Sequence, residues 1–246
     1  MGAEKKPLSS YSVFDTNHVP DETTDFAAGA LFLVDKPSGW SSFDIVKFIR
    51  NRIRTKKTGH AGTLDPLATG LLILCCGKAT KSISLIQDYP KRYIAEATLG
   101  ASTPSQDAAT KPDETSDYEH VDEKGIEAAI KAHFTGEILQ IPPMYSALWK
   151  DGKRLYTYAR KGETVERAPR TVSVHSCTLT SFERPAFKLD ILCSKGTYVR
   201  TLIHDLGTSV GSLAYMSALR RTEIGPYGVD TAITIEQIRN GYFDNL

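Results

Sequence analysis

Hydrophobic residues recur along this chain with two different periods. A spacing of three to four residues predicts a helix over residues 42–54, whereas an unbroken apolar run predicts a buried strand over 71–76. The same patterns predict, in chain order, a strand at 31–34, a helix at 78–87, a strand at 91–99, a helix at 121–134, strands at 171–182 and 187–193, and helices at 198–206 and 235–240.

The order of these elements indicates the fold class. Strands follow one another without regular alternation of strand and helix, which favours an α+β fold on a largely antiparallel sheet. The stretch 101–120 is rich in small polar residues and prolines, so we expect a mobile surface loop there. Residues 1–28 form a polar, acidic N-terminal extension that we expect to be flexible, which leaves 29–246 as one domain.

Composition narrows the class of protein. The 246 residues are 41% hydrophobic and 24% charged, and no apolar run is long enough to span a bilayer. The polar N-terminus is unlike a signal peptide, so we expect a cytoplasmic protein without a membrane association. The four cysteines show no zinc-ligand spacing, so we expect reduced thiols and no metal.

Charge is distributed unevenly although the formal net charge is only +1. No acid lies between Asp44 and Asp65, while many acids lie near the N-terminus and in 107–123, in places that look dispensable to a core. The acid-free stretch contains Lys47, Arg50, Arg52, Arg54, Lys56, Lys57 and His60. Such segregation is typical of a polyanion-binding protein, the alternative being a solvated helix face.

The segment 59–70 presents one carboxylate in an irregular stretch. Three glycines and a proline exclude regular structure, and a residue before proline favours extended geometry, so Asp65 should lie on a bend. We expect Leu64 and Leu67 to shield Asp65 from water, which would require an Arg or Lys partner for the charged form. An Asx-turn is the alternative interpretation.

The segment around Asp65 resembles the catalytic motif of the TruB-type pseudouridine synthases, which isomerise uridine 55 in the T-loop of tRNA. Other stretches resemble further motifs of that family in the same order, and together they run from about residue 30 to the C-terminus. They are residues 36–42, 91–93, 142–148, 152–156, 195–201 and 219–221. The loop 102–107 fits the family's Thr-and-Asp loop only loosely.

The resemblance implies a fold and a reaction. It implies the pseudouridine synthase fold, a central antiparallel sheet with flanking helices and an active-site cleft, here without the family's C-terminal RNA-binding module. Asp65 would be the nucleophile or charge stabiliser, Arg200 its ion-pair partner, and Tyr93 a ring that stacks on the target base. Attack at C1′, attack at C6 and an elimination route all stay open. The reaction is redox-neutral, so no cofactor is expected.

The resemblance also implies a set of substrate-binding residues. His60 would fill the gap left by the flipped nucleotide, and Tyr198 would form a wall of the pocket. The remaining candidates are Lys36 and Pro37, which would support the pocket tyrosine, and Lys81, Leu219, Arg220 and Arg221, as phosphate or pocket contacts. The expected partner is the T-stem-loop of tRNA, bound by a monomer without a protein partner.

Two other functions compete with this one. A phosphate-binding loop is suggested by Gly77-Lys78, but Leu72 and Ala79 occupy positions where that motif needs a glycine and a hydroxyl. A non-enzymatic RNA-binding module is the stronger rival, because basic patches and aromatic rings serve either role. It predicts that function survives removal of the Asp65 carboxylate.

Overall fold

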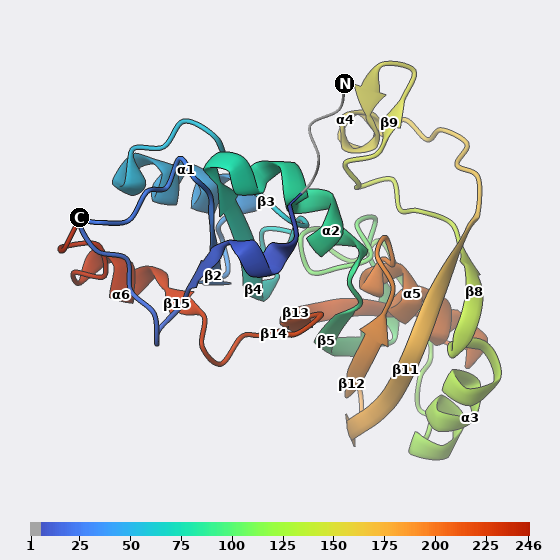
Figure 1. Cartoon of the computed structure of the whole chain (residues 1–246). Helices are drawn as coiled ribbons and strands as arrows, with labels where there is room; N and C mark the ends of the chain where they lie inside the picture. Colours follow the sequence, from blue (N-terminus) through green and yellow to red (C-terminus); the bar gives the residue numbers. More distant parts are fainter. Residues whose placement is uncertain (1–5) are drawn as a thin grey trace. The chain divides into compact units, whose positions relative to one another are not determined.

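The computed structural model describes residues 6–246, which divide into two compact units. Unit 1 combines the chain up to Arg92 with Arg220–Leu246, and unit 2 is Tyr93–Leu219 (Figure 1). Two strands pass from one unit into the other along the chain: β5 (Lys91–Leu99) and β13 (Ala214–Ile224). Consequently neither unit is a simple continuous stretch of sequence.

Unit 1 is built on a mixed sheet. Its long strands β2 (Ala30–Lys36) and β4 (Thr69–Cys76) are antiparallel, and β4 also pairs in parallel with Arg220 and Arg221 of β13. The shorter strands are β1 (Ser12–Phe14), β3 (Thr58–His60), β14 (Tyr227–Gly228) and β15 (Ile233–Thr234). The helices are α1 (Ser42–Ile53), α2 (Ile83–Asp88) and α6 (Ile235–Arg239), with 3-10 turns η1 (Leu8–Ser10) and η2 (Gly77–Ser82).

Side chains of β2 and β4 alternate between two cores because successive strand residues point to opposite faces. Phe32 and Leu72 lie in a cluster with α1 and α6 residues, whereas Leu33 and Ile73 lie in a cluster with η2 and α2 residues. Both faces of these strands are therefore covered, which explains their unbroken apolar sequence.

Helix α1 begins where its sequence favours a start. Ser41 caps the helix by accepting a hydrogen bond from the Asp44 amide, and the Asp44 carboxylate accepts one from the Ser41 amide. The apolar residues that predicted the helix, Ile45, Val46 and Ile49, are buried against the sheet. The opposite face of α1, with its basic residues, is left exposed.

The N-terminal segment is integrated into unit 1 from Lys6 onward. Strand β1 pairs in parallel with β2, and Tyr11, Phe14 and Phe26 lie in the two cores. The acidic composition of this segment had indicated an extension, but its few aromatic residues give it buried anchors. Residues 1–5 of the predicted extension lie outside the described residues, and the domain boundary at 28/29 stays a prediction.

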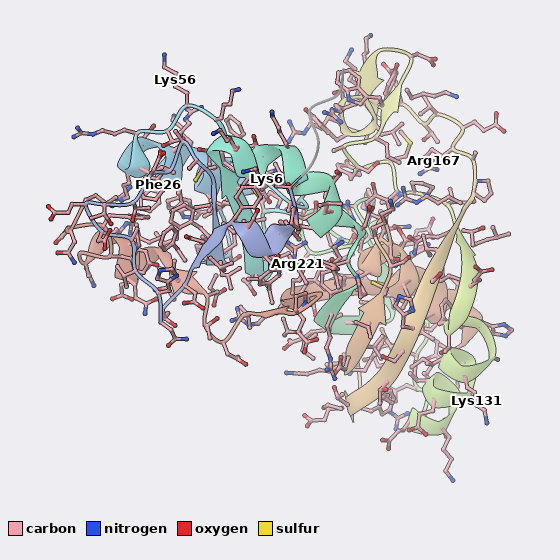
Figure 2. All side chains as sticks on the ribbon, in the orientation of Figure 1. Lys6, Phe26, Lys56, Lys131, Arg167 and Arg221 are labelled. Atoms are coloured by element: carbon pink, nitrogen blue, oxygen red, sulfur yellow. The ribbon has the colours of Figure 1, made fainter. Side chains whose placement is uncertain are left out.

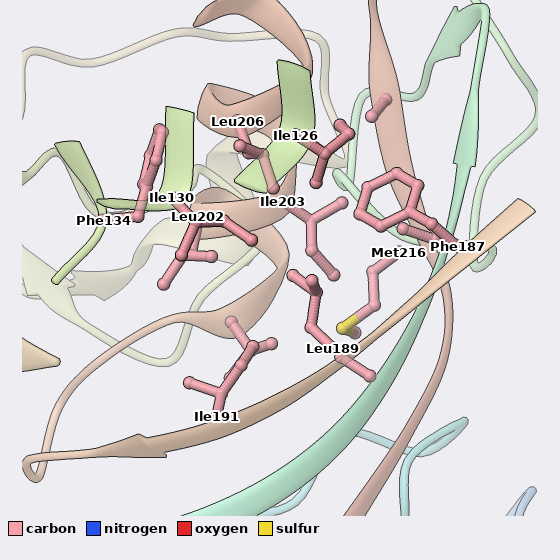
Figure 3. Packing of buried hydrophobic residues seen from close by; sticks show 14 of the residues in the cluster. Ile126, Ile130, Phe134, Phe187, Leu189, Ile191, Leu202, Ile203, Leu206 and Met216 are labelled. Carbon is pink, nitrogen blue, oxygen red and sulfur yellow. The ribbon is translucent and has the colours of Figure 1, made fainter. Parts of the chain in front are cut away.

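Unit 2 contains a largely antiparallel sheet with the order β13, β5, β12, β11, β8. Its strands include β8 (Gly136–Gln140), β11 (Arg170–Glu183) and β12 (Ala186–Cys193), and β11 is antiparallel to both neighbours. Helices α3 (Glu123–His133) and α5 (Val199–Ser209) pack their apolar side chains against this sheet (Figure 3). Smaller elements are β6 (Ala101–Ser102), β7 (Glu114–Thr115), β9 (Trp149–Lys150), β10 (Lys153–Arg154) and α4 (Leu155–Ala159).

The predicted α+β class is confirmed, and the predicted helices and strands occur within a few residues of their expected bounds. Three differences matter for the site. Strand β13 was not predicted, the helix expected at 78–87 begins as the 3-10 turn η2, and the expected mobile loop 101–120 contains two strands and a buried segment around Asp107. Within residues 6–246, no helix is long and apolar enough to cross a membrane.

Candidate functional site

The predicted bend around Asp65 is present between β3 and β4. Residues 61–68, here called the Asp loop, contain no helix or strand, and the Ala68 amide donates to the Asp65 carbonyl across 3.1 Å. Gly62 adopts a φ of +132°, a conformation that L side chains rarely allow. Asp65 therefore lies on a tight turn, as its proline neighbour had predicted.

The backbone of the Asp loop is held at every carbonyl from residue 62 to residue 66. Each of these five oxygens accepts a hydrogen bond from a donor outside its own residue. The donors are Arg221 for Gly62 and Thr63, the Ser42 hydroxyl for Leu64, the Ala68 amide for Asp65, and Lys36 with the Gly39 amide for Pro66. Since buried carbonyls without partners are costly, this arrangement fixes one backbone conformation for the loop.

Lys36 lies at the end of β2 with none of its surface exposed. Its ammonium group donates to the carbonyls of Pro37, Trp40 and Pro66 at 2.8, 2.7 and 3.1 Å. These three bonds use all three donors of the ammonium, so Lys36 joins the 36–40 turn to the Asp loop. Burial lowers the pKa of Lys36 to about 8, and the nearby charge of Asp65 partly opposes that shift.

Arg221 is also buried, with 1% of its surface exposed. Its guanidinium donates to the carbonyls of Leu71, Thr63 and Gly62 at 2.8, 3.4 and 3.1 Å. The sequence analysis expected a phosphate or pocket contact, which stays a prediction, and the structure buries this side chain within unit 1. Arg221 is thus a clamp on the Asp loop, because it spans the loop from its start to the beginning of β4.

The surroundings of Asp65 differ in part from expectation. Leu64 is buried, as predicted, but Leu67 is 41% exposed. The attraction that Asp65 exerts on Lys36 is mutual, so the buried ammonium favours the charged form of the Asp65 carboxylate. Within unit 1 the charge of Asp65 interacts electrostatically with Lys36, and the predicted ion-pair partner of Asp65 stays a prediction.

His60 ends β3 immediately before the Asp loop. The Gly62 amide donates to its Nδ1 atom at 3.4 Å, which leaves Nε2 to carry the proton of the neutral ring. Burial, and then the charge of Arg221, lower the pKa of His60, so the ring is neutral at pH 7. A neutral, half-buried ring is suited to fill a gap in a stack of bases.

The other predicted residues of unit 1 are distributed around these groups. Arg220 forms a bidentate ion pair with Asp35, with N–O distances of 3.1 and 2.7 Å. Its guanidinium is therefore bound to a carboxylate of the same unit. Lys81 is exposed in the last turn of η2, as a phosphate contact would require. Pro37 is half-buried and accepts the Lys36 hydrogen bond described above.

Arg200 is the central charged residue of the candidate site in unit 2. It lies in the first turn of α5, is 4% exposed, and donates to the carbonyls of Ser105 and Tyr145 at 3.2 and 2.6 Å. Its guanidinium lies 3.5 Å from the Asp107 carboxylate. Arg200 therefore joins three segments that are far apart in the sequence.

Asp107 is a residue that the sequence analysis missed. It was counted among acids dispensable to a core, but it is 5% exposed, and its carboxylate accepts hydrogen bonds from the Ser105 hydroxyl and the Ala109 amide at 2.6 and 2.9 Å. The loosely matching loop 102–107 thus supplies buried hydrogen-bond acceptors for the Arg200 guanidinium. The only available signal was the loop's weak resemblance to the family pattern.

The candidates Tyr198, Tyr93 and Leu219 of unit 2 are less buried than Arg200. The backbone of Tyr198 is held by the Gln140 side chain, which accepts a hydrogen bond from its amide at 2.8 Å and donates one to its carbonyl at 3.0 Å. The Tyr198 ring lies near the guanidinium groups of Arg170 and Arg200, at 4.8 and 5.7 Å from its centroid. Tyr93 and Leu219 are half-buried at the edge of the unit 2 core.

The charged groups of the two units offer polar chemistry. Among residues 6–246, no group of three His, Cys, Asp or Glu side chains is arranged to hold a metal ion. Unit 1 offers a carboxylate on a rigid turn with two buried cations bound to the same loop. Unit 2 offers a buried guanidinium beside an aromatic ring. Such preorganised charges stabilise charge that develops during a reaction.

Comparison with known proteins gives matches over almost the whole chain. The model of the TruB family pseudouridylate synthase N-terminal domain matches residues 50–199, and that of the tRNA pseudouridylate synthase B C-terminal domain matches 200–245. The tRNA pseudouridine synthase B of Flavobacterium johnsoniae is 44% identical over 218 residues, which cover 86% of this chain and 95% of that protein. The protein of the same name from Cupriavidus metallidurans is 49% identical over 210 residues, which cover 85% of this chain and 66% of that protein.

Solved structures give the same picture for the fold. A chain in the crystal structure of a Cbf5-Nop10-Gar1 complex superimposes with a TM-score of 0.70 and 30% identity, over 98% of this chain and 61% of that one. A chain of an H/ACA RNP bound to a substrate RNA containing 2′-deoxyuridine superimposes with a TM-score of 0.67 and 28% identity, again over 98% and 61%.

Proposed function

This chain belongs to the TruB family of pseudouridylate synthases, and on that premise we propose that it converts uridine 55 in the T-loop of tRNA to pseudouridine. The fold is the pseudouridine synthase fold, as the structural matches show. The observation that carries the proposal is Asp65 on a loop whose five successive carbonyls are all held by donors. A carboxylate positioned in this way is the one group that the reaction requires.

The reaction explains why these residue types are needed. The N1–C1′ bond of uridine breaks, the base turns, a C5–C1′ bond forms, C5 loses its proton and N1 gains one. Nothing is oxidised or reduced. Asp65 supplies the nucleophile or the negative charge beside the sugar and base, and Lys36 keeps that carboxylate charged. The rigid Asp loop holds the carboxylate in place while the detached base rotates.

The remaining roles follow the family pattern residue by residue. Tyr93 stacks on the target base, Tyr198 lines the pocket, and His60 fills the space that the flipped nucleotide leaves. Arg200 is the proposed ion-pair partner of Asp65, and Asp107 positions Arg200 through the contact described above. Lys81 contacts phosphate, while Lys36 and Arg221 act on the Asp loop and not on the substrate.

The proposed substrate is the T-stem-loop of tRNA, bound by a monomer in the cytoplasm without a protein partner. One structural match is named as part of a complex with further proteins, whereas we propose that this chain needs none. Purified chain alone should therefore act on a tRNA transcript. A requirement for an added protein would contradict this part of the proposal.

Replacing Asp65 by Asn tests the proposed function directly. We expect Asp65→Asn to abolish tritium release from tRNA labelled at C5 of its uridines, with tRNA affinity unchanged within about twofold, because amide and carboxylate have the same shape but only one is charged. Asp230→Asn, which changes an exposed Asp in the same unit, is the matched control and should retain activity.

Mapping of the modified nucleotide completes this test. Release at uridine 55 by wild type and Asp230→Asn alone supports the synthase. Tight tRNA binding by a wild-type protein that releases no tritium would instead identify a non-enzymatic RNA-binding module.

A further inference from the structure

Two hollows lie along the exposed face of α1 and meet at Asn51. The first, of about 400 Å³, is lined by Gly39, Trp40, Asp44, Lys47, Phe48 and Asn51. The second, of about 340 Å³, is lined by Arg50, Asn51, Arg54, Thr55 and Lys56. Neither includes a residue of the Asp loop, and none of these residues has a role in the proposed reaction.

The first hollow has aromatic walls. The rings of Trp40 and Phe48 meet edge to face with their centroids 5.4 Å apart, and both side chains are half-buried. One face of Phe48 is covered by the Arg52 guanidinium at 3.6 Å. The carboxylate of Asp44 and the amide of Asn51 add hydrogen-bonding groups at the rim. An aromatic wall with polar groups beside it suits a nucleobase, and the charges of Asp44 and Lys47 in this lining offset one another.

The second hollow is cationic. Arg54 and Lys56 are exposed, Arg50 is half-buried, and the Lys56 side chain projects away from the ribbon (Figure 2). Within the described part of the chain, none of these three cations has a hydrogen bond or an ion pair with another side chain. Cations near the C-terminal end of a helix interact favourably with its dipole, which accounts for Arg50. Arg54 is the C-cap of α1 and shares that interaction, but Lys56 follows the helix and does not.

We propose that this face of α1 binds RNA outside the modified nucleotide, with a base in the aromatic hollow and backbone phosphates in the cationic hollow. The inference rests on the proposed function, since it assigns a second contact surface to the same tRNA substrate. Charge complementarity selects the partner: the stretch from Asp44 to Asp65 contains six Lys and Arg residues and no acid.

A pair of charge-reversal variants tests this surface. We expect Arg54→Glu/Lys56→Glu to raise KM for tRNA about tenfold at about 0.1 M salt, with kcat unchanged, and to flatten the dependence of log affinity on log salt by about two. Lys124→Glu/Lys131→Glu carries the same change of charge on exposed positions of α3 and is the control. Circular dichroism and thermal melting of each variant establish that it is folded.

Cross-linking gives a readout that does not depend on activity. Benzoylphenylalanine placed at Asn51, where the hollows meet, should cross-link to tRNA at nucleotides other than uridine 55, whereas the same group at Lys131 should not. Equal tRNA affinity of the two double variants, or no cross-link from position 51, would overturn the proposal. Because binding and cross-linking are measured without turnover, a protein that releases no tritium would refute the proposed function and leave this surface testable.

Discussion

Lys36 and Arg221 are buried cations that donate to backbone carbonyls around the Asp loop. Lys36 uses all three donors on three carbonyls, and one of them belongs to Pro66, next to Asp65. The cost of burying its charge appears as a pKa near 8 instead of 10.5. An apolar side chain of similar length at position 36 would avoid that cost. The structure therefore indicates a role for the charge itself, which holds the loop through hydrogen bonds and attracts the Asp65 carboxylate.

This depressed pKa predicts a pH dependence of stability. Above about pH 8 the folded state releases the Lys36 proton, whereas the unfolded chain keeps it up to about pH 10.5. The unfolded state then binds more protons, so the free energy of unfolding should rise with pH across this window, by about 3 kcal/mol for such a shift. The contribution is complete above the unfolded pKa and is lost as pH falls through the folded one.

Urea unfolding of wild type and Lys36→Met between pH 7 and pH 10.5 measures this contribution. The difference in unfolding free energy between the two proteins should change in favour of wild type as pH rises, because other titrating groups cancel in the comparison. A constant difference across the range would show that Lys36 is not desolvated as described.

At the scale of elements, the approach of β13 to β4 determines where Arg221 lies. Gly70 pairs with Arg221 across the two strands and has a φ of +100°. A Cβ atom at Gly70 would overlap the backbone of Arg221, including its carbonyl oxygen. The close contact between these strands therefore requires glycine, both for its backbone conformation and for its missing side chain.

Gly70→Ala should consequently be more destabilising than its backbone conformation alone implies. The positive φ costs about 1–2 kcal/mol, and displacement of β13 adds to it, so we expect a total loss above about 2 kcal/mol in urea unfolding. Gly39→Ala is the matched control, since Gly39 has a φ of +83° and no atom within 4 Å of an added Cβ. Equal losses of unfolding free energy in the two variants would mean that displacement of β13 does not destabilise the protein.

At the scale of the whole molecule, positive charge is concentrated although the net charge is only +1. If tRNA binds mainly through phosphates, its affinity should fall steeply with salt, by about tenfold or more between 50 and 200 mM. Fluorescence anisotropy with labelled tRNA across this range measures the slope. A flat response would contradict a phosphate-dominated interface, whatever the activity of the protein.

Much of this architecture was predictable from the sequence, for identifiable physical reasons. Helix α1 and strands β2 and β4 have strong periodic or unbroken apolar patterns, and the bend at Asp65 follows from the proline after it. Strand β13 was missed because Arg220 and Arg221 interrupt its alternation. A buried arginine whose partners are carbonyls leaves no complementary acid in the sequence to reveal it.

Asp107 escaped prediction for a related reason. Its loop has the composition of a mobile segment, and the opposite charge that accompanies its buried carboxylate comes from Arg200, 93 residues further along. Local composition describes what a segment tolerates when alone. The site depends on pairs that meet only in the folded chain.

The five anchored carbonyls of the Asp loop have a consequence for protein engineering. Apart from the Ala68 amide, the groups that hold this backbone lie outside the loop, at Lys36, Gly39, Ser42 and Arg221. A graft of the short Asp-containing segment into another scaffold would transfer the sequence of the motif without its backbone conformation. The smallest part that could be transplanted with its conformation is therefore most of unit 1, and not the loop alone.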